Sequence, residues 1–249
     1  NKLPGGNVAP DLVLGQENFT TNNPGAGLDQ LNWPVGVATK DGRVVVADTY
    51  NDRILIWNTF PTKNGQPADL VLAIASDMIE HRGDIVWPWA VWTNGEKVIV
   101  TSTGANQVLI WNKFPTENNQ QADLVLQFKD KFGTPRTIGS DGKHLIIGDH
   151  NAFGKSRGNF FWKSFPSYDD QPYDFFITDV VHTEKRPKAL LPSSNKRFPY
   201  EIFWGPSFTQ NGKLLALGRQ LYIWNSFPQN ENDFPDLLVG NKGPELEGY

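Results

Sequence analysis

The chain of 249 residues contains no cysteine. This absence excludes disulfides, thiol catalysis and metal or iron–sulfur sites built on cysteine. An excess of positive charge is absent too, because the 23 Lys and Arg residues are outnumbered by 27 Asp and Glu residues, which gives a net charge of −4. No overall basic field would therefore draw the protein to nucleic acid or to an anionic membrane. The best apolar run, residues 70–75, has only the length of a strand, whereas a membrane-spanning helix needs about 18 apolar residues.

What the sequence does contain is a repeated signature. Four times an apolar residue precedes Trp-Asn-x-Phe-Pro or Trp-Lys-x-Phe-Pro, and a short apolar segment headed by Asp follows. The signatures cover residues 56–61, 110–115, 161–166 and 223–228, and the Asp-headed segments cover 69–72, 123–126, 174–177 and 236–239. A fifth Asp-headed segment, residues 11–14, has no signature before it. Self-similarity at roughly 40–50 residues with several short strands per unit is typical of a β-propeller.

Each unit has the pattern of four antiparallel strands. In the first unit these are 35–38, 43–47, 53–57 and 69–72, and Asp41-Gly42 forms the hairpin turn between the first two. We therefore predict an all-β fold, a propeller of four-stranded antiparallel blades in a single domain over residues 1–249. Four full blades are expected at about 33–72, 87–126, 134–177 and 204–239, with one additional outer strand at 11–14.

The first unit also carries a more specific pattern. It runs Pro34-Val35-Gly36-Val37-Ala38, then Asp41-Gly42, Val44-Val45-Val46-Ala47-Asp48-Thr49, Asn51, Arg53 and Ile54-Leu55-Ile56-Trp57. With these residues the chain resembles the NHL-type β-propeller family, although Ser102-Thr103 stand in the second unit where the first has Asp48-Thr49. Because the strand 11–14 has no partner strands in the sequence, we expect a ring completed by residues beyond Tyr249 or by another chain, and the resemblance implies six blades. A self-contained four-bladed ring is the alternative.

Loops on one face of the predicted propeller differ from blade to blade, and loops on a rigid scaffold are where function usually lies. This variable face carries the loops that enter the first strand of each blade and those that join the second strand to the third. Trp33, Trp87 and Trp204 are expected at equivalent entrances near the central channel, with Trp89 beside them. These tryptophans are candidates for contact with a partner or ligand.

Two further candidate regions lie on the variable face. Asp149 and His150 occupy a long turn, where the neighbouring carboxylate would orient the imidazole and raise its pKa. The connection 178–203 is much longer than the others, and long connections in compact domains are often functional. It carries a basic set that could dock an acidic partner: Lys185, Arg186, Lys188 and Arg197.

Three recurring features are interpreted as structural. The tryptophans of the third strands should be packing wedges whose indole N–H finds a backbone acceptor. The Asp that heads each fourth strand should cap the preceding turn. Asp48, Asn51 and Arg53 should form a network that braces one turn.

The function predicted from these observations is that of a non-catalytic binding or assembly module for a protein partner or small ligand, without a cofactor. One alternative is a metal-dependent lactonase or lyase that uses calcium or zinc at the channel mouth, with Asp48, Asp149 and His150 among the ligands. Another is a carbohydrate-binding propeller that uses the entrance tryptophans. The sequence starts without Met, and Asn18-Phe19-Thr20 is a glycosylation sequon, so an extracytoplasmic location, secreted or periplasmic, is expected.

Overall fold

The fold was analysed in a computed structural model that describes residues 8–74, 82–127, 131–154, 156–178, 204–217 and 221–240. These residues form four antiparallel sheets of four strands each, and the strands of every sheet follow one another in chain order. One 3₁₀ turn, Thr49–Asn51, is the helical structure found in this part of the chain. No helix there has the length and apolar character needed to cross a membrane.

The first and second blades have the strand lengths expected of short propeller sheets. The first consists of β1 (Pro34–Lys40), β2 (Arg43–Asp48), β3 (Arg53–Trp57) and β4 (Leu70–Leu72). The second consists of β5 (Pro88–Thr93), β6 (Val98–Ser102), β7 (Gln107–Trp111) and β8 (Leu124–Leu126). Both open on a proline, which lacks the N–H that an interior strand position would need.

The third and fourth blades repeat the same order. The third consists of β9 (Pro135–Ser140), β10 (Leu145–Ala152), β11 (Ser156–Trp162) and β12 (Phe175–Thr178). The fourth consists of β13 (Trp204–Phe208), β14 (Leu214–Leu217), β15 (Leu221–Trp224) and β16 (Leu237–Val239). The prediction of a propeller with four full four-stranded blades is confirmed.

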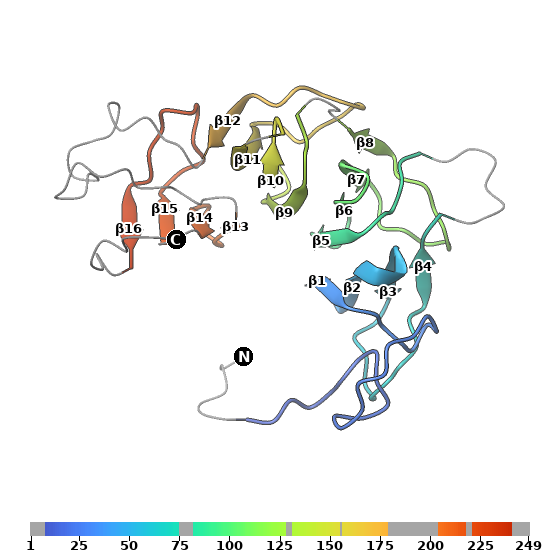
Figure 1. The fold of residues 1–249 in the computed structure, drawn as a ribbon. Coiled ribbons are helices and arrows are strands. Elements are labelled where there is room, and N and C mark those ends of the chain that lie inside the picture. Colours follow the sequence, from blue (N-terminus) through green and yellow to red (C-terminus); the bar gives the residue numbers. More distant parts are fainter. Residues whose placement is uncertain are drawn as a thin grey trace.

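The blades follow one another around an arc, as Figure 1 shows. The first strands, β1, β5, β9 and β13, line the inside of this arc, and the fourth strands lie on its outside. Consecutive inner strands pack together, β1 on β5, β5 on β9 and β9 on β13. Loops from neighbouring blades therefore meet near the inside of the arc.

Apolar clusters between neighbouring blades form the core. The first two blades share one cluster, the second and third share another, and the third and fourth share a third. The tryptophans of three of the third strands are buried in these layers, whereas Trp57 is buried in a fourth cluster formed by the first blade with Leu14 and Leu31. Each Nε1–H donates to a backbone carbonyl in the loop that follows. The pairs are Trp57 with Gln66, Trp111 with Gln120, Trp162 with Gln171 and Trp224 with Asp233, at 2.8–2.9 Å. The interpretation of these indoles as packing wedges is confirmed.

The aspartate that heads each fourth strand has the predicted capping role. In every blade its Oδ2 accepts the backbone N–H of the residue after the tryptophan, at 2.7 Å. The pairs are Asp69 with Asn58, Asp123 with Asn112, Asp174 with Lys163 and Asp236 with Asn225. Four copies of one bond hold the loop between the third and fourth strands in the same conformation.

Residues 11–14 differ from the prediction, because they form no strand. Their position is nevertheless that of a fourth strand from a preceding blade. The N–H of Val13 donates to Asn64 Oδ1 at 3.0 Å and its carbonyl accepts the N–H of Gly65 at 3.0 Å. Val71 of β4 makes the same two contacts with Asn118 and Asn119 of the second blade. The segment lacks ladder pairing because, in the described part of the chain, no third strand lies beside it.

Candidate functional site

Four aromatic side chains gather on the variable face, and we call them the aromatic patch: Trp33, Tyr50, Trp87 and Trp89. Trp33 precedes β1, Tyr50 lies in the 3₁₀ turn after β2, Trp87 precedes β5 and Trp89 is inside β5. The patch therefore draws on loops of two adjacent blades. The prediction that Trp33, Trp87 and Trp89 lie together agrees with this geometry, whereas Tyr50 was not predicted.

Hydrogen bonds between the two blades bring these loops into contact. Thr49 Oγ1 donates to the carbonyl of Pro88 at 2.7 Å, and Asp52 Oδ1 accepts the N–H of Trp87 at 2.6 Å. Trp33 and Trp87 both have a positive φ, 52° and 49°, a left-handed conformation that is uncommon for residues other than glycine. Backbone strain of this kind concentrates at functional sites, where the surrounding structure enforces it.

The rings of the patch contact one another at angles that range from 7° to 88°. The centroids of Trp33 and Tyr50 are 4.4 Å apart, and Trp33 lies edge-on to Trp89 at 5.7 Å and 88°. Trp87 also meets Trp89 edge-on, at 5.7 Å and 72°, while Tyr50 and Trp87 are parallel at 6.3 Å. Trp33 is 45% exposed and Tyr50 is 54% exposed. Large apolar side chains are thus open to solvent in one contiguous cluster.

A positively charged group adjoins the patch. Arg136 is the second residue of β9, as Trp89 is of β5, and its guanidinium carbon lies 4.2 Å from the centroid of the Trp89 ring. Arg136 Nη1 contacts His150 Nδ1 at 3.0 Å. Because arginine only donates, His150 accepts this bond through Nδ1. The structure therefore brings Trp89, Arg136 and His150 together across two blades.

Asp149 does not orient His150 as the sequence suggested. It is fully buried, and its oxygens accept the backbone N–H groups of Gly133, Thr134 and Asn151 at 2.8–2.9 Å. Burial raises the pKa of Asp149, and these three hydrogen bonds together with the charge of Arg136 offset part of that shift. The physical reason for the difference is that β10 turns the Asp149 carboxylate toward the loop that enters its own blade.

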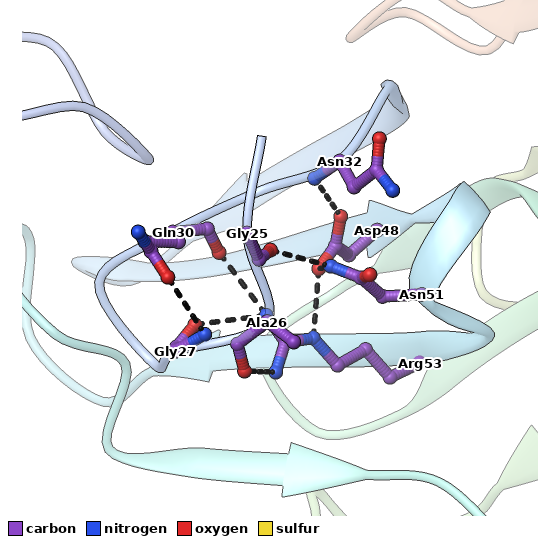
Figure 2. A network of polar contacts seen from close by, with 8 residues as sticks. All are labelled: Gly25, Ala26, Gly27, Gln30, Asn32, Asp48, Asn51 and Arg53. Atoms are coloured by element: carbon purple, nitrogen blue, oxygen red, sulfur yellow. Dashed lines mark hydrogen bonds and ion pairs between the residues drawn. The ribbon is translucent and has the colours of Figure 1, made fainter. Parts of the chain in front are cut away.

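Asp48 has the equivalent bracing role in the first blade (Figure 2). Its Oδ1 accepts the N–H of Asn32 at 2.6 Å, and its Oδ2 accepts Asn51 Nδ2 and Arg53 Nε, both at 2.7 Å. Arg53 in turn donates to three backbone carbonyls, those of Ala26, Gly27 and Gln30. The predicted network of Asp48, Asn51 and Arg53 is confirmed. It anchors the segment that leads into Trp33.

Trp204 was predicted at the same entrance as Trp33 and Trp87, and its backbone position differs from theirs by register. Trp204 is the first residue of β13 and pairs with Leu217 of β14, whereas Trp33 and Trp87 stand before their strands. The reason is register, because Pro34 and Pro88 open their strands directly, whereas Pro206 lies two residues inside β13.

Four predicted contact residues fall outside the described part of the chain. They are the basic residues of the long connection, Lys185, Arg186, Lys188 and Arg197. Within the described residues, no three histidine, aspartate or glutamate side chains are grouped so that they could hold a metal ion. Asp48 and Asp149, which the enzyme alternative would use as ligands, are already bonded to the chain itself.

Comparison with known proteins supports the fold. Residues 31–57 match the NHL repeat, so the predicted resemblance is confirmed over the first unit. No curated protein matches the chain. The crystal structure of RRP9 WD40 repeats aligns with a TM-score of 0.50 and 12% identity, over 83% of this chain and 52% of that one.

Two further solved structures align less closely. The computationally designed Ika4 protein gives a TM-score of 0.45 at 12% identity, over 88% of this chain and 99% of that one. YCF48 bound to D1 peptide gives 0.42 at 11% identity, over 82% and 51%. The chain thus spans about half the length of the RRP9 and YCF48 chains that it matches. At such identities the likeness to RRP9 shows the propeller fold alone.

Proposed function

We propose that this NHL-repeat propeller is a non-catalytic binding module whose aromatic patch contacts a protein partner. The observation that carries the proposal is the cluster of solvent-exposed rings on a face built from strained, hydrogen-bonded loops. Exposed apolar clusters on soluble proteins mark interaction sites, and Trp, Tyr and Arg dominate the energetics of protein interfaces. A propeller scaffold of this type is typically a protein-interaction module.

The two alternatives predicted from the sequence receive less support. The carboxylates of Asp48 and Asp149 accept hydrogen bonds that brace loops. Metal binding by these carboxylates, as in a metal-dependent lactonase or lyase, would require those hydrogen bonds to break. A carbohydrate platform would offer parallel ring faces to a sugar, whereas within the patch only Tyr50 and Trp87 are parallel and both Trp33 and Trp87 are steeply inclined to Trp89. Binding without a cofactor and a location outside the cytoplasm stay predictions from the sequence.

The proposal is tested with a variant that removes the two most exposed rings, Trp33→Ala with Tyr50→Ala. Proteins crosslinked to the wild-type chain in an extract of its source are identified and then measured one by one in purified form. We expect the double variant to lose at least about tenfold in affinity for a true partner, because truncation of central aromatic residues costs about 2 kcal/mol or more.

The matched control is Tyr168→Ala. Tyr168 is equally exposed, at 56%, but it lies in the loop between β11 and β12, on the opposite face. Its removal should leave the affinity unchanged. If the patch variant binds every partner as tightly as the wild type does, the aromatic patch is not the binding site.

We also infer an assembly role, in which three further strands complete the blade before β1. In the first three blades a cationic or imidazole side chain at the start of the second strand lies over the phenylalanine of the next blade. The pairs are Arg43 with Phe114 at 4.3 Å, Lys97 with Phe165 at 5.2 Å and His144 with Phe227 at 4.0 Å. Phe60 is the equivalent phenylalanine of the first blade and is 60% exposed. Val37 of β1, on the same side of the blade, is 66% exposed.

Amide hydrogen exchange tests this assembly. Leu12 and Leu14 flank Val13, so their amides are placed to pair with an added third strand. In an assembly that carries the three additional strands, from a longer polypeptide or from another chain, we expect these two amides to exchange at least about tenfold more slowly than in the 249-residue chain. Equal exchange in both forms would contradict the assembly role and would leave the binding proposal untouched.

A further inference from the structure

The Trp89 end of the aromatic patch is positively charged. We infer that the patch binds a peptide segment in which a carboxylate lies beside an aromatic or proline side chain. Arg136 would receive the carboxylate, and Trp33 with Tyr50 would receive the apolar side chain. This inference rests on the proposed function and adds the chemical class of the ligand.

The described residues offer the charge of Arg136 no direct carboxylate partner. The opposite charge that acts on it is Asp149, but all three hydrogen bonds found at that carboxylate come from backbone N–H groups. Among the described residues Arg136 has no ion pair within 4 Å. An anion from outside the chain would supply the counter-charge that the described residues do not place within 4 Å of this guanidinium.

The surroundings of Arg136 also penalise its positive charge. Burial lowers the pKa of Arg136, the charge of Asp149 opposes that shift, and the second cation Arg157 lowers the pKa further. A group in such an environment gains from an added negative charge, because the charged form is then favoured by a nearby opposite charge. The Coulomb interaction would also be stronger here than in bulk water, since the site is partly buried.

Arg136 is held in place by two contacts that leave it able to act on a ligand. Its guanidinium stacks on Trp89, and Nη1 bonds to His150. Nε is buried without a hydrogen-bond partner in the described part of the structure, so the ring and the imidazole determine the orientation. A guanidinium presents several N–H donors in a fixed plane, which matches the two oxygens of a carboxylate.

Two other ligand classes fit less well. A nucleic acid would bring many phosphates to a chain with a net charge of −4, and the long-range field would oppose its approach. A flat sugar would stack on parallel ring faces, but within the patch only Tyr50 and Trp87 are parallel, and Trp33 and Trp87 stand at 88° and 72° to Trp89. Aromatic-lined surfaces of inclined rings are the type that receives proline and aromatic side chains of peptides.

A pair of small probes tests the inference: N-acetylphenylalanine, which carries a carboxylate, and N-acetylphenylalaninamide, which is its neutral counterpart. Binding is followed by NMR through the indole N–H signals of Trp33, Trp87 and Trp89. We expect the carboxylate probe to bind at least about fivefold more tightly than the amide, with an advantage that shrinks as salt screens the charges. Arg136→Gln should abolish the difference, and Arg136→Lys should retain part of it.

The control variant is Arg43→Gln, which removes an arginine that also lies over an aromatic ring, Phe114, but on the opposite face. It should keep the full preference for the carboxylate. Equal binding of the two probes, or no binding of either, overturns the inference about ligand class. Tighter binding of glucuronic acid than of N-acetylphenylalanine would overturn the assignment to a peptide. The crosslinking experiment with Trp33→Ala and Tyr50→Ala judges the proposed function separately.

Discussion

Asp48→Ala is expected to lower the free energy of unfolding by about 3–5 kcal/mol, the usual cost of removing one partner from a buried ion pair. Asp48 is fully buried and its partner Arg53 is 8% exposed. Without the carboxylate, the guanidinium would remain among backbone carbonyls with no counter-charge. Urea unfolding followed by circular dichroism measures the change, with the m-value as a check on two-state behaviour.

The effect should exceed the loss of one hydrogen bond because the Asp48 carboxylate joins two parts of the chain. It accepts the N–H of Asn32 ahead of β1 and bonds to Arg53 of β3. Arg53 fastens the segment around Gly27 that leads toward Trp33. We therefore expect Asp48→Ala to loosen the aromatic patch as well, which broadened indole signals of Trp33 would show.

Two controls separate the buried pair from charge removal in general. Asp41→Asn removes one partner of the exposed pair with Lys40, whose atoms are 4.0 Å apart, and should cost less than about 1 kcal/mol. The double variant Asp48→Ala with Arg53→Met should be less destabilised than the sum of the single changes, since it leaves no unpaired charge. Additive losses would show that the two side chains act independently.

The fold could be predicted because its determinants are local and repeated. A tryptophan at the end of each third strand and an aspartate at the head of each fourth recur at fixed spacing, and both make the same bond in every blade. The pairing of neighbouring strands follows from the hairpin turns and the alternation of buried residues. None of these signals depends on how the blades are arranged around the arc.

The candidate site could be predicted only in part, because it is formed between blades. Arg136 reaches Trp89 from the adjacent inner strand, and no spacing within one unit shows that contact. The signal that could have revealed it is register, since both residues follow the proline that opens an inner strand. Tyr50 was missed because a single aromatic residue in a turn gives no periodic signal.

The different register of Trp204 and the unpaired segment 11–14 have related explanations. Trp204 precedes Gly205-Pro206, which is similar in sequence to the Trp-Pro pairs at the start of the first two blades. The strand pairing with Leu217, however, begins at Trp204 itself. Residues 11–14 have the sequence of a fourth strand and the contacts of one, as the two bonds of Val13 show. Ladder pairing also requires a third strand beside the segment, and the amino acids of the segment alone do not show whether such a strand is present.

The second large effect is expected from Trp111→Ala. Trp111 is 1% exposed and packs in the cluster between the first two blades, against Val45 and Ile54 among others. Truncation would leave a cavity there and remove the N–H that Gln120 accepts. Changes of this kind cost about 3–5 kcal/mol, and the unmet carbonyl adds to the loss.

The central claim is that Trp111, Trp162 and Trp224 hold neighbouring blades together, whereas Trp33 remains open for contact with a partner. It is tested most directly by measuring the unfolding free energies of Trp111→Ala and Trp33→Ala side by side. We predict a loss of about 3–5 kcal/mol for Trp111→Ala and of less than about 1.5 kcal/mol for Trp33→Ala, which gives up only exposed ring contacts. Equal losses, or a larger loss for Trp33→Ala, would contradict the account.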